Sequence, residues 1–108
     1  MKRDHVRGHL DLLLLSVLQG GPAHGYAVVG ALRDRSGGAF DLPEGTVYPA
    51  LHRLEEAGWV TSSWEMASGR RRRMYAVTQA GRLACVEQRD EWRGLVRGMQ
   101  AILQVSPA

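Results

Sequence analysis

Residues 45–78, GTVYPALHRLEEAGWVTSSWEMASGRRRRMYAVT, contain the pattern from which the fold is predicted. Its first half spaces apolar residues as an amphipathic helix does, and its second half is rich in aromatic and β-branched residues on both sides of a turn. The second half also contains four consecutive arginines, Arg70–Arg73. Like charges repel, so this run predicts either a solvated basic turn or a surface that meets an anionic partner.

The segment from about residue 43 to 57 is predicted to be a helix that Gly58 ends. Asp41 and Glu44 have the spacing of a capping box at its start. Pro49 has no N–H to donate, so we expect a bent or slightly irregular first turn within one continuous helix. The buried stripe of this helix is expected to consist of Val47, Leu51 and Leu54, with Ala50 and Ala57 beside it.

Two short strands follow, over about residues 59–66 and 72–78, with residues 67–70 as the turn between them. Side chains alternate between the two faces of a strand, so the four arginines are expected to divide into two pairs. One pair is Arg71 with Arg73, and the other is Arg70 with Arg72. One of these pairs is expected to brace the fold or to pair with Glu65.

The positive charge of the chain is local. The formal net charge is +3, and without the four arginines it would be −1. A local basic run on a nearly neutral body favours a directed contact with an anion over general stickiness. At 44% hydrophobic and 23% charged residues, the composition is that of a globular domain.

Two helices are expected upstream of the deciding stretch. The first spans residues 9–18, LDLLLLSVL preceded by His9, and is apolar nearly all round, which predicts burial on more than one side and contact with a second protomer. The second begins at His24 or Gly25 and ends at Arg35, and Tyr26 is expected to pack in the core rather than contact a ligand.

Downstream, Thr78 is a suitable N-cap for a long helix that reaches about Leu103. The later part of this helix places apolar residues close to a heptad seam, which favours helix–helix pairing. Cys85, the single cysteine, is expected to be a small packed hydrophobe.

The predicted order is three helices, a hairpin and a long helix. We therefore predict a mainly α fold with a small β-hairpin, the winged helix-turn-helix with a long C-terminal helix. The expected division is a winged helix-turn-helix DNA-binding domain over residues 1–78 and a C-terminal dimerisation helix over residues 79–108.

Three motifs of the chain, HGYAVVGAL, EGTVYPALHRLEEAGWV and GRRRRMYAVTQAG, closely resemble the PadR family of bacterial transcriptional regulators. LDLLLLSVL and EWRGL add weaker support, and the resemblance covers roughly residues 8 to 95. It implies a homodimer with a winged helix-turn-helix, built through the long last helix, that in most members represses transcription. The chain is similar to the short members, which end after that helix. A Pro at position 43, where many members carry a capping Ser or Asn, is a departure at the start of the recognition helix.

The resemblance implies that the helix over about residues 43–57 enters the major groove and that the Arg-rich wing, residues 68–73, lies on flanking DNA. Thr46, Tyr48 and Arg53 carry over most directly, because they fall in the segment that reads DNA in the family. The expected DNA-binding residues are His24, Gly25, Gly45, Thr46, Tyr48, Pro49, His52, Arg53, Arg70, Arg71, Arg72 and Arg73.

The last helix carries the expected dimer contacts, and two interpretations of Trp92 stay open. It packs in the seam between protomers, or it lines a site for a small, flat aromatic effector, with Leu10, Leu14 and Met99 as apolar walls. The expected dimer-interface residues are Leu10, Leu14, Trp92, Leu95, Val96 and Met99.

We therefore expect a cytoplasmic, dimeric regulator, most simply a repressor, that binds a palindromic double-stranded operator. The alternative is a winged-helix module that binds protein or RNA without promoter-specific DNA binding. No nucleophile–base set, paired carboxylates or Gly-rich phosphate loop is visible in the sequence, so no enzymatic activity is expected. Neither a cofactor, a metal site nor a membrane partner is expected, and the histidines, His5 and His9 included, are interpreted as non-ligands.

Overall fold

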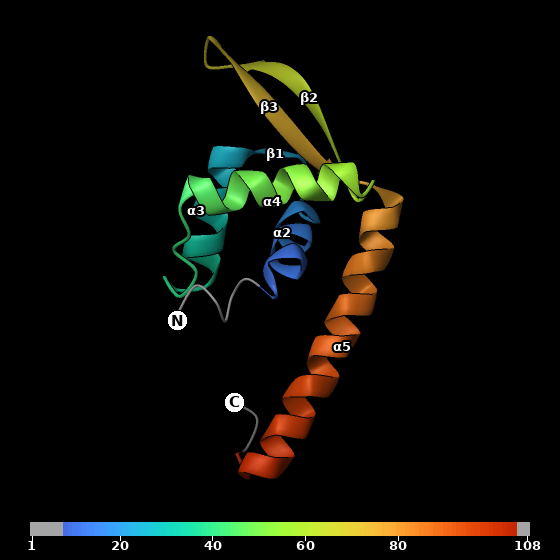
Figure 1. Cartoon of the computed structure of the whole chain (residues 1–108). Helices are drawn as coiled ribbons and strands as arrows, with labels where there is room; N and C mark the ends of the chain where they lie inside the picture. The colour runs from blue at the N-terminus through green and yellow to red at the C-terminus, as the bar shows by residue number, and fades with distance from the viewer. Residues whose placement is uncertain (1–7, 106–108) are drawn as a thin grey trace.

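A computed structural model of the protein describes residues 8–105, and Figure 1 shows how its elements are arranged. In chain order the elements are α2 (Leu10–Leu18), β1 (Ala23–His24), α3 (Gly25–Arg35), α4 (Glu44–Glu56), β2 (Val60–Ala67), β3 (Arg70–Val77) and α5 (Gln79–Leu103). The predicted order of helices, hairpin and long helix is confirmed. The strand β1 was not predicted, because two residues are too few to show an alternating pattern.

The core lies where α2, α3 and α4 meet, with α4 lying across the ends of the other two helices (Figure 1). Each of the three helices turns one apolar stripe inward, and Val60 of β2 and Cys85 of α5 complete the cluster. The expected stripe of α4 is confirmed for Val47, Ala50, Leu51 and Leu54, whereas Ala57 is exposed because it lies at the C-cap of the helix. The packed position of Cys85 is also confirmed. The buried apolar side chains of the helices include Leu10, Leu14, Leu15, Leu18, Val28, Leu32, Val47, Leu51 and Leu54.

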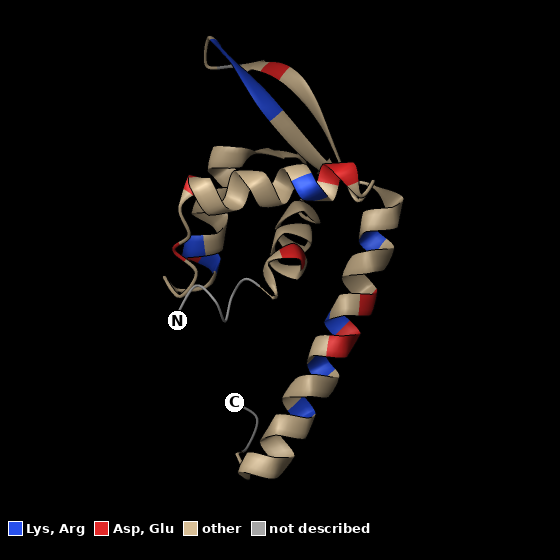
Figure 2. Ribbon diagram, in the orientation of Figure 1, with Lys and Arg blue, Asp and Glu red and all other residues tan. Residues whose placement is uncertain are grey.

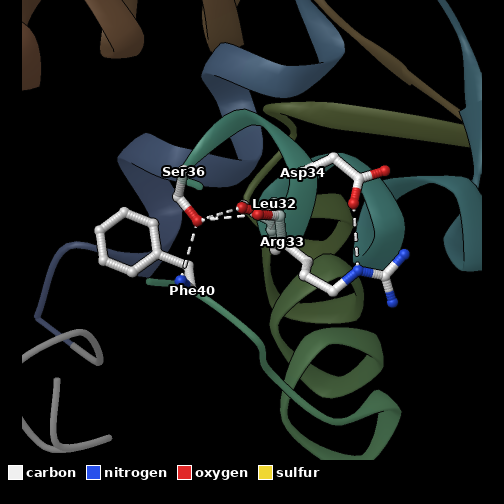
Figure 3. A network of polar contacts seen from close by, with 5 residues as sticks. All are labelled: Leu32, Arg33, Asp34, Ser36 and Phe40. Carbon is white, nitrogen blue, oxygen red and sulfur yellow. Dashed lines mark hydrogen bonds and ion pairs between the residues drawn. The ribbon is translucent and has the colours of Figure 1, made fainter. Parts of the chain in front are cut away.

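Side chains cap both ends of α3. At its start, Nδ1 of His24 accepts a hydrogen bond from the Ala27 N–H at 3.3 Å. At its end, the Ser36 hydroxyl lies 2.6 Å from the Leu32 carbonyl oxygen and accepts from the Phe40 N–H at 2.9 Å (Figure 3). The hydroxyl thus satisfies backbone groups on both sides of the turn that leads to α4. These hydrogen bonds hold the turn at residues 36–40, from which the chain continues to α4.

The start of α4 differs from the predicted capping box. Pro43 occupies the N-cap position in extended conformation, and no side chain caps the helix. The Pro43 carbonyl instead accepts from both the Thr46 and the Val47 N–H groups, at 3.0 and 3.2 Å, which tightens the first turn. Pro49 lies inside one continuous helix, as expected. Asp41 lies too far upstream to cap a helix whose N-cap is Pro43.

The sheet has the strand order β1–β3–β2, and both pairings are antiparallel. The hairpin of β2 and β3 pairs from Val60 with Val77 to Ala67 with Arg70, so Ser68 and Gly69 alone form its tip. Both tip residues have positive φ, at 53° and 77°, as a two-residue hairpin turn of type I′ requires. Arg70 and Arg71 therefore lie in β3, which begins two residues earlier than predicted.

The first turns of α5 belong to the core, and the rest of the helix projects from it (Figure 1). The Thr78 hydroxyl accepts from the Gly81 N–H at 3.0 Å, which confirms the predicted cap, and donates to the Gly58 carbonyl at 2.7 Å. Buried Ala84 and Cys85 pack against the body. The projection gives the molecule its extents of 53 × 28 × 21 Å. The core thus continues beyond Thr78 to Cys85 of α5, and the division of the chain after residue 78 stays a prediction.

Candidate nucleic-acid interface

The outward face of α4 is a stripe of four exposed residues at helical spacing, Gly45, Pro49, His52 and Glu56. The stripe lies opposite the buried residues of the helix, so any groove that α4 enters meets it first. Nε2 of His52 lies 3.0 Å from Oε1 of Glu56, one turn further along. Gly45 has no neighbouring side chain or backbone near the position that a Cβ would occupy. The backbone of the first turn is therefore open to close approach.

The two flanks of α4 face different neighbours. Arg53 lies toward α2, where its Nη2 is 3.6 Å from Oδ1 of Asp11. Tyr48 lies on the other flank, against the start of α3, where its ring fills the space in which a Cβ on Gly25 would stand. The outward stripe therefore lies between a guanidinium group on one flank, from Arg53, and a phenol group on the other, from Tyr48.

A cleft of about 320 Å³ separates Tyr48 from the wing. It brings together residues from α3, α4 and the hairpin, including all three tyrosines of the chain and three of the four consecutive arginines. Aromatic rings beside guanidinium groups suit stacking and the binding of anionic oxygens. The lining consists of His24, Gly25, Tyr26, Tyr48, Trp64, Arg71, Arg72, Arg73 and Tyr75.

The tyrosines Tyr48 and Tyr75 of this cleft stay protonated at neutral pH. Burial raises the pKa of Tyr48 above its ordinary value, and the carboxylate of Glu44 raises it further, while Arg72 opposes the shift. Burial also raises the pKa of Tyr75, against the effect of Arg73. Each phenol is thus a hydrogen-bond donor available to a phosphate oxygen.

The predicted alternation of the wing arginines is confirmed for the pair Arg71 and Arg73, while Arg72 lines the same cleft as both of them. Arg71 and Arg73 both lie over the ring of Trp64, with their Cζ atoms 4.9 and 5.1 Å from its centroid. Arg73 also contacts Glu55 and Ser62. Of the two alternatives for an arginine pair, bracing of the fold or pairing with Glu65, the structure thus supports bracing for Arg73, with Glu55 of α4 as the partner. Figure 2 shows the run as a continuous basic stretch on β3 that leads to the tip of the hairpin.

The structure places several of the predicted DNA-binding residues around this one cleft, namely His24, Gly25, Tyr48 and Arg71–Arg73. Gly45, Pro49 and His52 lie on the outward stripe and Arg53 on the far flank, with half-buried Thr46 on the same side. Gly25 is buried beneath Tyr48, which corrects its prediction as a contact residue to one as a packing residue. Arg70 lies exposed beside the hairpin tip.

Sequence reasoning misplaced one aromatic residue and missed another. Tyr26 was expected in the core, yet it is 65% exposed, because Val28 and Leu32 fill the inward side of α3. Trp64 was not singled out, although it lies opposite Arg73 in the hairpin and is 55% exposed. A large aromatic residue at the centre of a strand beside a basic run was the available signal.

The dimer-interface prediction needs two corrections. Leu10 and Leu14 are 2% and 0% exposed within the single chain, so they pack in the protomer core and offer no side chain to a partner. They cannot form walls around Trp92 either. Trp92 instead lines a cleft of about 310 Å³ between the start of α2 and the middle of α5, with Gly8, His9, Asp11, Leu12, Gln88, Glu91 and Leu95.

Met99 lies further along α5, in a separate apolar groove of about 480 Å³. The groove is formed by Gly94, Leu95, Gly98, Met99, Ile102 and Leu103. Its large side chains are half exposed or more, with Ile102 at 83%. Beyond Arg97, the described part of α5 carries no charge (Figure 2).

Over residues 8–105, no three of the His, Cys, Asp and Glu side chains are grouped so that they could hold a metal ion. His9 lies in these residues, while His5 lies outside them. No helix in the same range has the length and apolar character needed to cross a membrane.

Comparison with known proteins assigns the chain and its fold to a family. Residues 14–87 match the model of the transcriptional regulator PadR-like family. A PadR family regulator from Eggerthella lenta is 32% identical, with a TM-score of 0.83 over 95% of this chain and 88% of its own. A PadR family regulator from hypervirulent Clostridium difficile is 33% identical, with a TM-score of 0.80 over 89% of this chain and 99% of its own.

A third relative is a transcriptional regulator of Mycobacterium tuberculosis, 43% identical over 58 residues, which are 54% of each chain. These matches define a class, the winged-helix transcriptional regulators that bind DNA, rather than an enzyme family. Within that class, this chain belongs to the PadR family.

Proposed function

We propose that the protein is a homodimeric repressor that binds a palindromic operator, with the outward stripe of α4 in the major groove and the wing on flanking DNA. The observation that carries this proposal is the cleft between Tyr48 of α4 and the arginines of the wing. Tyr48 and the arginines of β3 line it together, so a duplex that reaches the stripe also reaches the basic strand. Such a regulator works in the cytoplasm, where bacterial DNA lies.

The unpartnered groove of α5 supports the homodimer. Leu95, Met99 and Ile102 are exposed on one side of a helix that projects from the core, and burying such a surface against a second copy removes it from water. Gly94 and Gly98 lie one turn apart in the same groove and allow close approach of a second helix. A two-fold dimer then presents two copies of α4 to two half-sites about one helical turn of DNA apart.

Selection of bound DNA from a random duplex pool tests the proposal. We expect recovery of a palindrome whose half-sites are spaced for a dimer. A random single-stranded RNA pool, treated in parallel, serves as the comparison. Recovery of no duplex motif would contradict the proposal and favour the module that binds protein or RNA.

We further propose that the Trp92 cleft takes a small, planar aromatic cation whose binding releases DNA. The ring of Trp92 supplies a stacking surface, and the carboxylates of Asp11 and Glu91 supply the negative charge. Titration of tryptophan fluorescence with N-methylacridinium tests this, with the uncharged parent acridine at alkaline pH as the comparison. We expect stronger quenching by the cation, which Trp92→Phe should abolish. Equal quenching of the wild-type protein and the Trp92→Phe variant by N-methylacridinium would contradict the proposed site.

A further inference from the structure

We propose that Glu55 is a positioning residue that holds the wing against the recognition helix, and that Arg73 serves this contact rather than a DNA phosphate. The inference rests on the proposed DNA-binding function and concerns the geometry that function needs. Glu55 lies in the last turn of α4, and its contacts reach the middle of both hairpin strands.

The contact is a three-residue network between α4 and the two hairpin strands. Ser62 of β2 donates its hydroxyl hydrogen to Oε2 of Glu55. Nε of Arg73 in turn donates to the Ser62 Oγ at 2.9 Å, and Nη2 of Arg73 lies 3.7 Å from the same Glu55 oxygen. The Ser62 hydroxyl thus donates to the carboxylate and accepts from the guanidinium at once. We call this network the Glu55 latch.

The latch also organises the aromatic face of the wing. Arg73 lies over the ring of Trp64, its cross-strand partner, and Arg71 lies over the same ring. Arg73 therefore has a carboxylate, a hydroxyl and an aromatic ring around its guanidinium before any DNA arrives. A phosphate would have to displace these partners, whereas Arg70 is exposed beside the tip.

A two-stranded hairpin needs such a contact to keep its direction. An isolated ribbon of two strands is marginally stable in water, so packing at its base decides where its tip points. The latch joins the last turn of α4 to Ser62, near the base of the hairpin, and to Arg73, in the middle of β3, and the side chain of Glu55 is only 26% exposed. Charge-assisted hydrogen bonds at a partly buried site hold geometry better than those in open water.

The direction in which DNA affinity changes when Glu55 is neutralised distinguishes a positioning role from a purely electrostatic one. Glu55 is an anion beside a DNA-binding surface, so its neutralisation would tighten binding if charge alone mattered. If Glu55 positions the wing, the same change weakens binding. Glu65 provides the matched control, because it is an exposed acid of β2 on the opposite strand face. Among the described residues, its side chain makes no ion pair or hydrogen bond.

The test measures operator affinity of Glu55→Gln and Glu65→Gln across salt concentrations, using the selected duplex. We expect a loss of about fivefold to tenfold for Glu55→Gln, within the usual range of coupled networks, and no loss for Glu65→Gln. Arg73→Ala should add little in the Glu55→Gln background, and the salt dependence should stay that of the wild type. Unchanged or tighter binding by Glu55→Gln would overturn the proposal, as would a flatter salt dependence for Arg73→Ala alone.

A second measurement reads the latch without DNA. In a Trp59→Phe, Trp92→Phe background, Trp64 is the remaining tryptophan of the chain. Quenching of Trp64 fluorescence by acrylamide should increase in Glu55→Gln but not in Glu65→Gln. Ser62→Ala, which removes only one hydroxyl, should increase the quenching too and serves as the test variant if Glu55→Gln folds poorly. Unchanged quenching in both latch variants would overturn the latch. Failure of the wild-type protein to select DNA would instead overturn the proposed function, and with it the role of the latch in binding.

Discussion

At the scale of single residues, alanine substitutions at Gly45 and Gly30 distinguish a loss of DNA contact from a change in helix stability. Both lie in helices, and an added methyl group meets open space at Gly45 and only the end of Arg33 at Gly30. Gly45→Ala should leave folding intact or raise stability by up to about 1 kcal/mol, since alanine favours helix. It should nonetheless weaken operator binding several-fold if the first turn of α4 approaches DNA closely.

The measurement for Gly45→Ala is operator affinity beside the urea midpoint of unfolding, with Gly30→Ala as the control. Gly30→Ala should show a similar change in stability and wild-type affinity. Wild-type affinity in Gly45→Ala would show that its backbone stays away from the duplex.

The wing arginines give a second residue-scale prediction. Arg70 is exposed at the end of β3 nearest the tip, and Arg72 lies opposite Glu65 in the hairpin, whereas Arg71 and Arg73 lie over the ring of Trp64. Arg70→Ala combined with Arg72→Ala should weaken binding to operator and random DNA equally. Affinity falls as the salt concentration rises, and this fall should become less steep. The magnitude of the slope of log affinity against log salt should decrease by about 0.9 for each phosphate that an arginine no longer neutralises. Weaker binding to the operator alone would show base reading rather than phosphate binding.

At the scale of elements, the start of α5 is fixed by one close approach. A Cβ on Gly81 would overlap the carbonyl oxygen of Trp59, which already accepts the Thr78 N–H at 3.0 Å. Because that neighbour is backbone, α5 would have to move as a unit to make room. Gly81→Ala should therefore destabilise the protein by about 1–3 kcal/mol, as overpacking does.

Urea unfolding of Gly81→Ala measures this cost against Gly30→Ala, where the nearest atom stands at 3.7 Å in ordinary contact. Equal midpoints for the two variants would mean that α5 adjusts at no cost in stability. A selective loss would confirm that the last helix is rigidly joined to the end of the recognition helix through residues 58–59 and Thr78.

At the scale of the whole molecule, the proposed dimer makes the apolar groove of α5 the surface to disrupt. Met99→Asp combined with Ile102→Asp should yield monomers at micromolar concentration, because two charges would be buried between helices. Val86→Asp on the opposite side of α5 is the control, since Val86 is also about half exposed and should tolerate the change.

Sedimentation velocity distinguishes these variants, and operator binding should follow the oligomeric state. The monomeric variant should lose most of its affinity, because one α4 reads only one half-site. A double variant that still sediments as a dimer would place the interface elsewhere on the molecule.

The sequence was sufficient to predict the main helices, the hairpin and several residues of the candidate site. Local rules fixed the helix stripes, the Thr78 cap, the hairpin and the division of the arginines, because spacing and turn chemistry act over a few residues. The family was also visible in three motifs, and the matched model over residues 14–87 confirms it.

Only the tertiary structure decided which apolar and charged residues meet. Leu10 and Leu14 pack inside the protomer, and Tyr26 faces solvent, because a helix that is apolar on several sides does not reveal which side the neighbouring helices cover. Glu55 rather than Glu65 pairs with Arg73 for a similar reason. Glu65 lies opposite Arg72, the residue before Arg73 in β3. Because side chains alternate between the two faces of a strand, Arg73 lies on the other face of the hairpin. Packing of that face toward α4 brings Glu55 and Ser62 to the guanidinium of Arg73.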